Sequence, residues 1–223
     1  MTAGEGASSA VDRATLRLRE LITQGRFVGG QPLIEANLVG QLGVARSTVR
    51  ECIRHLETQG LLVARARGLQ LRRLDRRDVE DLFALRELLE VYAAGRAAKR
   101  FASVPSAARQ AITRELRYWR SSAAGDVGAF SDRNRQLHDL IVELAGNVHL
   151  PRMLDHTLLV LFSSQFRPWL PARTIRPAID DHVRVLESIE REDARAAEAA
   201  MRRHIQAARQ ALEKLPDDAF GNA

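Results

Sequence analysis

The chain has 223 residues, of which 45% are hydrophobic and 28% charged, a balance typical of folded globular proteins that excludes disorder throughout. No stretch approaches the roughly 20 apolar residues that span a bilayer, and the first ten residues lack the basic and apolar regions of a signal peptide. We therefore expect a cytoplasmic protein with no membrane partner. The single cysteine, Cys52, excludes an internal disulfide and a Cys-x-x-Cys zinc site.

The net charge of +6 is confined to the first third of the chain. Residues 1–77 contain 13 Arg and 7 acidic residues, whereas residues 78–223 contain 21 basic and 21 acidic residues. This asymmetry favours a basic segment that binds a polyanion, joined to a neutral segment with another task. A merely solvated basic surface is the alternative.

The first third of the chain has the pattern of a winged helix-turn-helix. After a small, polar arm over residues 1–9, apolar spacing predicts helices over 11–23, 35–42 and 46–59, with Gly43 closing the second and Ser47 as N-cap of the third. Alternating apolar residues from Leu61 to Leu71 predict a short hairpin with Gly68 at its tip. We assign this domain to residues 10–74.

Beyond a charged linker at 74–77, the sequence shows only helical periodicity. The expected fold class is therefore mainly α, with an antiparallel bundle of about six helices over residues 78–214 and a frayed tail after Pro216. The predicted helices cover about 78–101, 105–123, 126–145, 148–166, 177–190 and 193–214.

The third helix combines a buried stripe with a basic face. Arg46, Arg50 and Arg54 recur every four residues, so they drift only about 40° per step around the helix and form a row of guanidinium groups. Ser47 and Thr48 lie in the first turn. Such a helix suits the major groove of DNA, where Arg pairs with guanine. The alternative is an exposed stripe that pairs with Glu51 and Glu57. The buried stripe consists of Val49, Cys52, Ile53 and Leu56.

Residues 31–68 resemble the winged helix of the GntR superfamily of bacterial regulators. The resemblance implies that Arg46, Ser47, Thr48 and Arg50 contact an operator in the major groove, and that Arg67 and Gly68 at the wing tip approach the minor groove. Two positions depart from the family pattern: Ala45 replaces a common Ser or Thr, and Ala36 stands where some relatives place an Arg. The matching positions are Leu33, Glu35, Leu38, Leu42, Gly43, Val44, Arg46, Val49, Arg50, Glu51, Leu56, Gly60, Leu61, Arg67 and Gly68.

Histidines in the neutral segment have spacings that bring them together in a bundle. A helix break is expected at residues 191–193, where Asp193 is the predicted N-cap of the following helix. His182 and His204 lie about 13 and 16 Å from this break, so an antiparallel hairpin places them at nearly the same height. Asn134 and His138 share one helix face because they are four residues apart. Such a group can hold a divalent metal. The alternative is a set of unrelated core and surface histidines.

Residues 78–214 resemble the FCD effector-binding domain of the FadR-type branch, nearer its shorter, six-helix VanR-like form. In metal-bearing members, one Asp and three His are the ligands, which correspond here to Asn134, His138, His182 and His204. An amide oxygen is a weaker donor than a carboxylate, so we expect zinc or nickel to bind less tightly, and manganese becomes possible. The resemblance rests on residues 86–90, 93–94, 134–138, 146–147, 181–182 and 204.

The expected function is transcription regulation rather than catalysis. The chain has no HExxH, Gly-x-Ser-x-Gly or glycine-rich phosphate motif, and no catalytic base is evident. We expect a homodimer on double-stranded operator DNA, because one helix reads only a few base pairs. The expected role is that of a repressor, and the resemblance implies that a small carboxylate releases it by binding at the metal. Arg86 either pairs with that carboxylate or forms an ion pair with Glu90. An alternative is that the metal ion itself is the signal.

Overall fold

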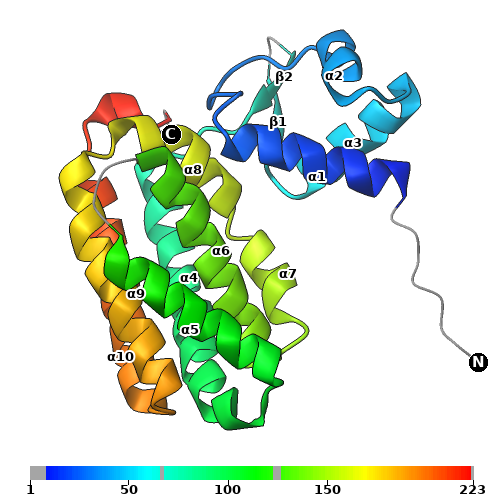
Figure 1. The fold of residues 1–223 in the computed structure, drawn as a ribbon. Coiled ribbons are helices and arrows are strands. Elements are labelled where there is room, and N and C mark those ends of the chain that lie inside the picture. Colours follow the sequence, from blue (N-terminus) through cyan, green and yellow to red (C-terminus); the bar gives the residue numbers. More distant parts are fainter. Residues whose placement is uncertain (1–8, 66–67, 123–126, 222–223) are drawn as a thin grey trace, which may run out of the picture. The chain divides into compact units, whose positions relative to one another are not determined.

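A computed structural model of the chain describes residues 9–65, 68–122 and 127–221 (Figure 1). The described residues form two compact units, which confirm the mainly helical fold class. One unit contains the residues up to Leu74 together with Leu158–Gln165 and Gly221; the other contains Asp75–Thr157 and Phe166–Phe220. The elements are α1 Ala10–Thr23, α2 Glu35–Leu42, α3 Arg46–Thr58, β1 Leu62–Arg65, β2 Gly68–Leu71, α4 Arg76–Arg100, α5 Ser106–Ser121, α6 Val127–Ala145, α7 Leu150–Asp155, α8 Leu159–Phe166, α9 Ile175–Glu190 and α10 Ala194–Glu213.

The first unit is a three-helix core with a hairpin. Ser9 and Asp12 form a reciprocal capping box that starts α1, and Gly43 ends α2 in the left-handed conformation that glycine adopts without strain. Both features follow from local residue type. Burial is complete along the facing sides of the helices and strands, at Leu18, Ile22, Leu38, Val49, Cys52, Leu56, Leu62 and Leu71.

The hairpin pairs β1 with β2 in antiparallel register, with Leu62 opposite Leu71 and Arg65 opposite Gly68. A bridge between Pro32 and Gln70 ties the segment before α2 to the outer edge of β2. The predicted wing is therefore present. Its tip residue Arg67 lies outside the described residues, whereas Gly68 has a φ of 99°, which favours glycine.

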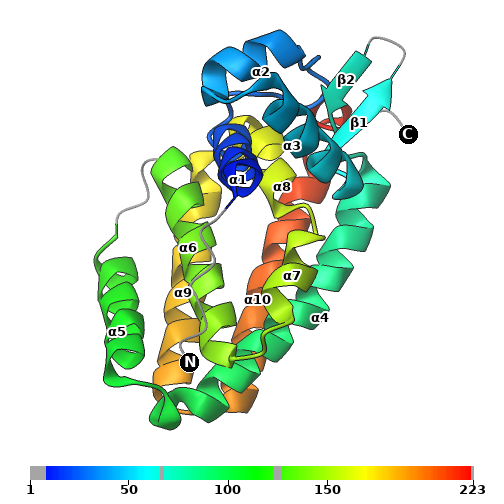
Figure 2. The ribbon, with the colours of Figure 1, turned by 90° about the vertical axis from the view of Figure 1, so that its right-hand side faces the viewer.

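The second unit is a helical bundle built around α4. Figure 2 shows α4, α6, α9 and α10 running side by side, and α4 packs on each of the other three. The contact between α4 and α10 is close because Gly95 lies against Glu198, where a Cβ atom would clash. Asp193 caps α10 by accepting a hydrogen bond from the Ala196 N–H, as predicted. No helix in the described part of the chain is long and apolar enough to cross a membrane.

Three local predictions about helix ends were wrong. Ala45, not Ser47, is the N-cap of α3, because the helix already begins at Arg46, and Ala45 makes no side-chain cap. The linker expected at 74–77 is shorter, since Asp75 and Asp78 form a capping box that starts α4 at Arg76. The single helix expected over 148–166 is broken between α7 and α8, where Leu158 adopts a φ of 55°.

Residues 217–221, which were expected to fray, are ordered. Residues Asp217–Ala219 form a 3-10 turn, and Phe220 packs against Phe166 with ring centroids 5.3 Å apart. Arg76 lies over the Phe220 ring and pairs with Asp217 at 2.7 Å. These contacts bind the chain end to the start of α4, which no local sequence pattern indicates.

Candidate functional site

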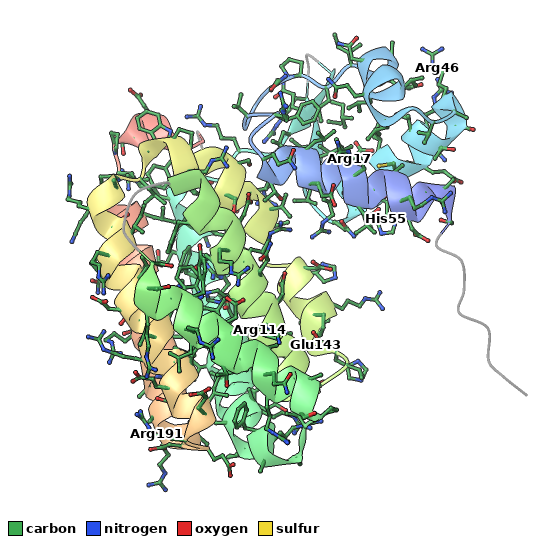
Figure 3. The ribbon with its side chains drawn as sticks, viewed as in Figure 1. Arg17, Arg46, His55, Arg114, Glu143 and Arg191 are labelled. Atoms are coloured by element: carbon green, nitrogen blue, oxygen red, sulfur yellow. The ribbon has the colours of Figure 1, made fainter. Side chains whose placement is uncertain are left out.

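The outer face of α3 carries the predicted DNA-reading residues. Arg46, Ser47, Arg50 and Arg54 are exposed and Thr48 is half-buried. On the opposite stripe Val49, Cys52 and Leu56 are buried as predicted, whereas Ile53 is only half-buried. Figure 3 shows Arg46 projecting outward from the start of α3. The helix therefore separates a packed side from a basic side, as its periodicity predicts.

A carboxylate at the start of α2 organises two of these arginines. Glu35 forms an ion pair with the Arg46 Nε atom at 2.8 Å and accepts the Nε–H of Arg50 at 3.1 Å. The hydrogen bond from Arg50 lowers the pKa of Glu35 below its ordinary value, so this carboxylate is ionised at neutral pH. Glu35 was not predicted as a partner of these arginines, because it precedes α3 in the sequence and only the turn between α2 and α3 brings it close.

Cys52 lies on the buried side of the same helix. Burial raises the pKa of the Cys52 thiol, which keeps it protonated. Its environment is that of a core residue rather than a nucleophile.

In the second unit, His138, His182 and His204 form a buried group that we call the histidine cluster. They come from α6, α9 and α10 respectively. Their ligand-capable atoms all lie within 4.8 Å of one another, and the two Nε2 atoms of His138 and His204 are 3.2 Å apart. The hairpin of α9 and α10 thus brings His182 and His204 to one height, with ring centroids 4.6 Å apart.

Several ring nitrogens of the histidine cluster have no hydrogen-bond partner. Both nitrogens of His182 and the Nδ1 atom of His204 are buried and unpaired among the described residues. Burial, with a contribution from the neighbouring histidines, holds the pKa of His182 well below its ordinary value and lowers that of His204 to about 3. Both rings are neutral at physiological pH, the state in which imidazole binds metals.

Aromatic side chains form the wall behind His182. The Trp119 ring on α5 meets the His182 ring edge to face at 4.5 Å, and Phe130 on α6 stacks on it at 5.8 Å. Trp119 is almost fully buried, and its indole Nε1 has no partner among the described residues. These rings fix the plane of His182.

A charged pair on α4 lies beside the cluster. The Arg86 Nε–H donates to Glu90 at 2.8 Å, and the other Glu90 oxygen contacts His138 Nδ1 through a short hydrogen bond. Burial by itself would raise the pKa of Glu90, but Arg86 and His138 outweigh it and lower the pKa below its ordinary value. The ion pair foreseen as one of two roles for Arg86 is therefore formed. Its other role, binding an effector carboxylate, stays a prediction.

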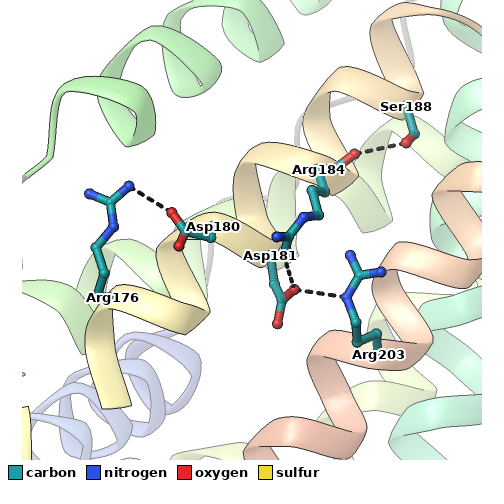
Figure 4. Close-up of polar contacts among 6 residues, drawn as sticks. All are labelled: Arg176, Asp180, Asp181, Arg184, Ser188 and Arg203. Atoms are coloured by element: carbon teal, nitrogen blue, oxygen red, sulfur yellow. Dashed lines mark hydrogen bonds and ion pairs between the residues drawn. The ribbon is translucent and has the colours of Figure 1, made fainter. Parts of the chain in front are cut away.

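A second buried carboxylate joins the two helices that carry His182 and His204. Asp181 accepts from Arg184 at 2.9 Å and from Arg203 at 3.0 Å (Figure 4). Because Asp181 precedes His182 and Arg203 precedes His204, this contact holds the two histidines in register.

The structure brings together three of the four predicted metal ligands. Asn134 lies one turn before His138 on α6 and is half-buried, so it shares the correct helix face. Zinc bound to imidazole nitrogens at about 2.0–2.1 Å in a tetrahedron separates them by about 3.3 Å. The spacing of His138 and His204 and the unpaired nitrogens of His182 fit such an ion.

Both units match known families. Residues 10–68 match the bacterial regulatory proteins of the gntR family, and residues 81–207 match the FCD domain. Two curated relatives are similar over most of their length. One is the probable D-xylose utilization operon transcriptional repressor of Paenarthrobacter nicotinovorans, 27% identical over 193 residues, or 83% of this chain and 81% of that protein. The other is the uncharacterized HTH-type transcriptional regulator YdhC of Bacillus subtilis, 24% identical over 195 residues, or 85% and 84%.

Solved structures share the fold. McbR/YncC of E. coli superposes with a TM-score of 0.78 at 19% identity, covering 90% of this chain and 95% of that one. A putative transcriptional regulator GntR from Rhodococcus sp. RHA1 gives a TM-score of 0.75 at 20% identity, covering 92% and 98%. These families and relatives are transcription regulators and not enzymes.

Proposed function

Because the chain belongs to the GntR family of bacterial regulatory proteins and carries an FCD domain, we propose that it is a ligand-responsive repressor. In this proposal, a small carboxylate binds at a divalent metal ion in the helical unit and weakens binding to operator DNA. The repressor assignment is supported by the relative named as a xylose operon repressor. Such a protein works at the chromosome, in the cytoplasm.

The DNA-binding step rests on the exposed face of α3. Arg46 and Arg50 extend from its first two turns, where a recognition helix meets base edges. Arg54, Ser47 and Thr48 flank them and suit phosphate contacts. One such helix reads only a few base pairs, so we propose a homodimer that presents two of them to a two-fold symmetric operator.

The sensing step rests on the histidine cluster. The single observation that carries it is the convergence of three buried imidazoles, two of which, His182 and His204, have ring nitrogens without a hydrogen-bond partner among the described residues. His138, His182 and His204 would hold zinc, nickel or manganese, with Asn134 as a weaker fourth ligand. When bound, the ion would offer an open coordination position to a carboxylate oxygen. Arg86 remains the predicted partner for the rest of that carboxylate.

Coupling between the two steps follows from thermodynamic linkage. If the effector binds better to the protein that is free of DNA, DNA binding weakens by the same factor. Typical coupling free energies are about 1–3 kcal/mol, or about 5- to 150-fold in affinity. This range sets the response that an experiment must resolve.

The DNA-binding step is tested with an operator selected from a random DNA library. We expect Arg46→Ala or Arg50→Ala to weaken binding to this site by about 1–3 kcal/mol, because each removes a base or phosphate contact. Arg77→Ala is the matched control, since Arg77 is an exposed cation on α4, far along the chain from α3. Equal affinities of wild type and Arg50→Ala would reject the assignment.

A second candidate is a regulator whose signal is the metal ion itself. It is favoured by the histidine cluster alone, since three converging imidazoles suffice to hold an ion. Calorimetry with zinc, nickel and manganese, followed by titration with acetate, malate and citrate, separates the two. A sensor of organic acids keeps its metal and titrates an acid, whereas a metal sensor changes DNA affinity with the metal alone.

A further inference from the structure

The ion pair between Arg86 and Glu90 is unusual because it is buried. Arg86 is only 7% exposed and Glu90 only 2%. Both side chains lie on one face of α4, four residues apart, and Glu90 reaches across to His138 on α6. A buried charge is retained only when hydrogen bonds or opposite charges satisfy it, so Arg86, Glu90 and His138 form one hydrogen-bonded network.

The charge on Glu90 determines which ring nitrogen of His138 carries the proton. Glu90 faces the Arg86 guanidinium and carries a negative charge, so both its oxygens can only accept hydrogen bonds. The short contact at His138 Nδ1 must then be an N–H donated to Glu90. With its proton on Nδ1, the His138 ring can offer a lone pair to a metal only from Nε2, which lies 3.2 Å from the Nε2 atom of His204 and faces the histidine cluster.

We propose that Glu90, held by Arg86, is a positioning residue that fixes the tautomer of His138 and directs its Nε2 lone pair into the cluster, so that a divalent cation binds more tightly. This inference rests on the proposed metal site and names residues outside its ligand set. A carboxylate that accepts from the far ring nitrogen orients a histidine ligand and makes it more basic.

The proposal gives Arg86 a role that does not require contact with an effector. Asn134 is a neutral ligand where the family pattern has an aspartate, so the orientation of the remaining histidines carries more of the affinity. As a positioning residue, Arg86 affects metal binding through Glu90. As an effector ligand, it would affect only the response to carboxylates.

Metal affinity is the first readout, measured by competition of zinc and nickel with a chromophoric chelator. Glu90→Gln alone removes the carboxylate that pairs with the buried Arg86 and can unfold the protein. The double variant Arg86→Met, Glu90→Gln removes both charges and avoids that cost. We expect it to bind metal about 10- to 100-fold more weakly than wild type, the range seen when an outer carboxylate is lost.

Glu87→Gln is the matched control. Glu87 lies on the same helix and pairs with Arg202 at 2.9 Å, so the control also removes one acidic charge from an ion pair. It should leave metal affinity within about two-fold of wild type, because no contact links Glu87 to the histidine cluster among the described residues. A folded double variant with wild-type metal affinity would overturn the proposal.

Nitrogen-15 spectra of metal-free protein give a second readout that is independent of the metal. We expect His138 to be a single Nδ1–H tautomer in wild type and a mixture of tautomers in the double variant. If wild type binds neither zinc nor nickel, the proposed metal site is wrong. The spectrum then still tests whether Glu90 fixes the tautomer of His138. Identical His138 tautomers in the two proteins would overturn it.

Discussion

On the proposed DNA-reading face of α3, Glu35 holds the guanidinium groups of Arg46 and Arg50 in place. Both arginines use Nε for this contact, which constrains where the rest of each guanidinium group can reach. Because Glu35 also adds a negative charge beside the proposed DNA-binding surface, it would oppose binding to any phosphate backbone. We therefore expect Glu35 to lower the affinity for DNA of any sequence and to increase the discrimination between sequences.

The corresponding variant is Glu35→Gln. It should bind unrelated DNA several-fold more tightly than wild type and discriminate less between the selected operator and its point mutants, as measured by anisotropy at several salt concentrations. The exposed Glu51→Gln on α3 is the control for charge alone. If both variants change affinity equally and keep the same base preferences, the positioning of the arginines by Glu35 is wrong.

The depressed pKa values of His182 and His204 predict an acid-sensitive fold. In the unfolded chain these rings protonate near the ordinary pKa of 6.5, whereas the folded chain keeps them neutral, in the case of His204 down to a pKa of about 3. The unfolded state thus binds more protons below pH 6.5, and the free energy of unfolding falls by about 1 kcal/mol per pH unit for each ring. Above pH 6.5 the two rings do not make the free energy of unfolding depend on pH.

Urea unfolding of metal-stripped protein across this pH range measures the effect. His204→Asn removes one of the two titrating rings and should make the decline below pH 6.5 shallower. A wild-type protein whose unfolding free energy stays constant from pH 7 to pH 5 would contradict the assignment of neutral, buried rings.

At the scale of helices, the contact between Asp181 and Arg203 determines how α9 and α10 present their histidines. Asp181→Asn should lower the free energy of unfolding by about 1–2 kcal/mol, less than for a fully buried pair, because the arginine partners are half-exposed. The neighbouring Asp180→Asn is the control, since Asp180 is 40% exposed and pairs with Arg176 on its own helix. That change should stay within about 0.5 kcal/mol. Equal effects of the two substitutions would show that the link between α9 and α10 is energetically unimportant.

The helices also show what sequence patterns can predict. The bounds of α2 and the cap of α10 were predicted because Gly43 and Asp193 act through their own backbone neighbourhood. The break at Leu158 was missed because no proline or glycine marks it. The ordered chain end was missed for a related reason, since Phe220 is held by residues distant in sequence.

The candidate site likewise contains contacts that regular helix geometry predicts and contacts that depend on how distant segments pack. Helical spacing and hairpin symmetry predicted that His182 and His204 would meet, because both depend on regular geometry. The carboxylate beside His138 could not be assigned, since the position of Glu90 against α6 depends on how α4 packs. Glu35 was missed for the same reason.

For the whole molecule, the division of charge follows the division of tasks. The excess positive charge lies in the segment that includes α3, and the neutral segment contains the histidine cluster. A two-fold operator requires two copies of the chain, so we expect sedimentation to give about twice the 24.9 kDa mass of one chain. A monomer at the concentrations that saturate DNA would contradict this arrangement.

The central claim is that a ligand bound at the histidine cluster weakens the binding of α3 to DNA. The most direct measurement is the dissociation constant for the selected operator, determined for metal-loaded and metal-stripped protein with and without acetate, malate or citrate. We predict that at least one carboxylate raises this constant by about 5- to 150-fold in the metal-loaded protein and has no effect after the metal is removed. A constant that stays the same under every combination of metal and carboxylate would contradict the account.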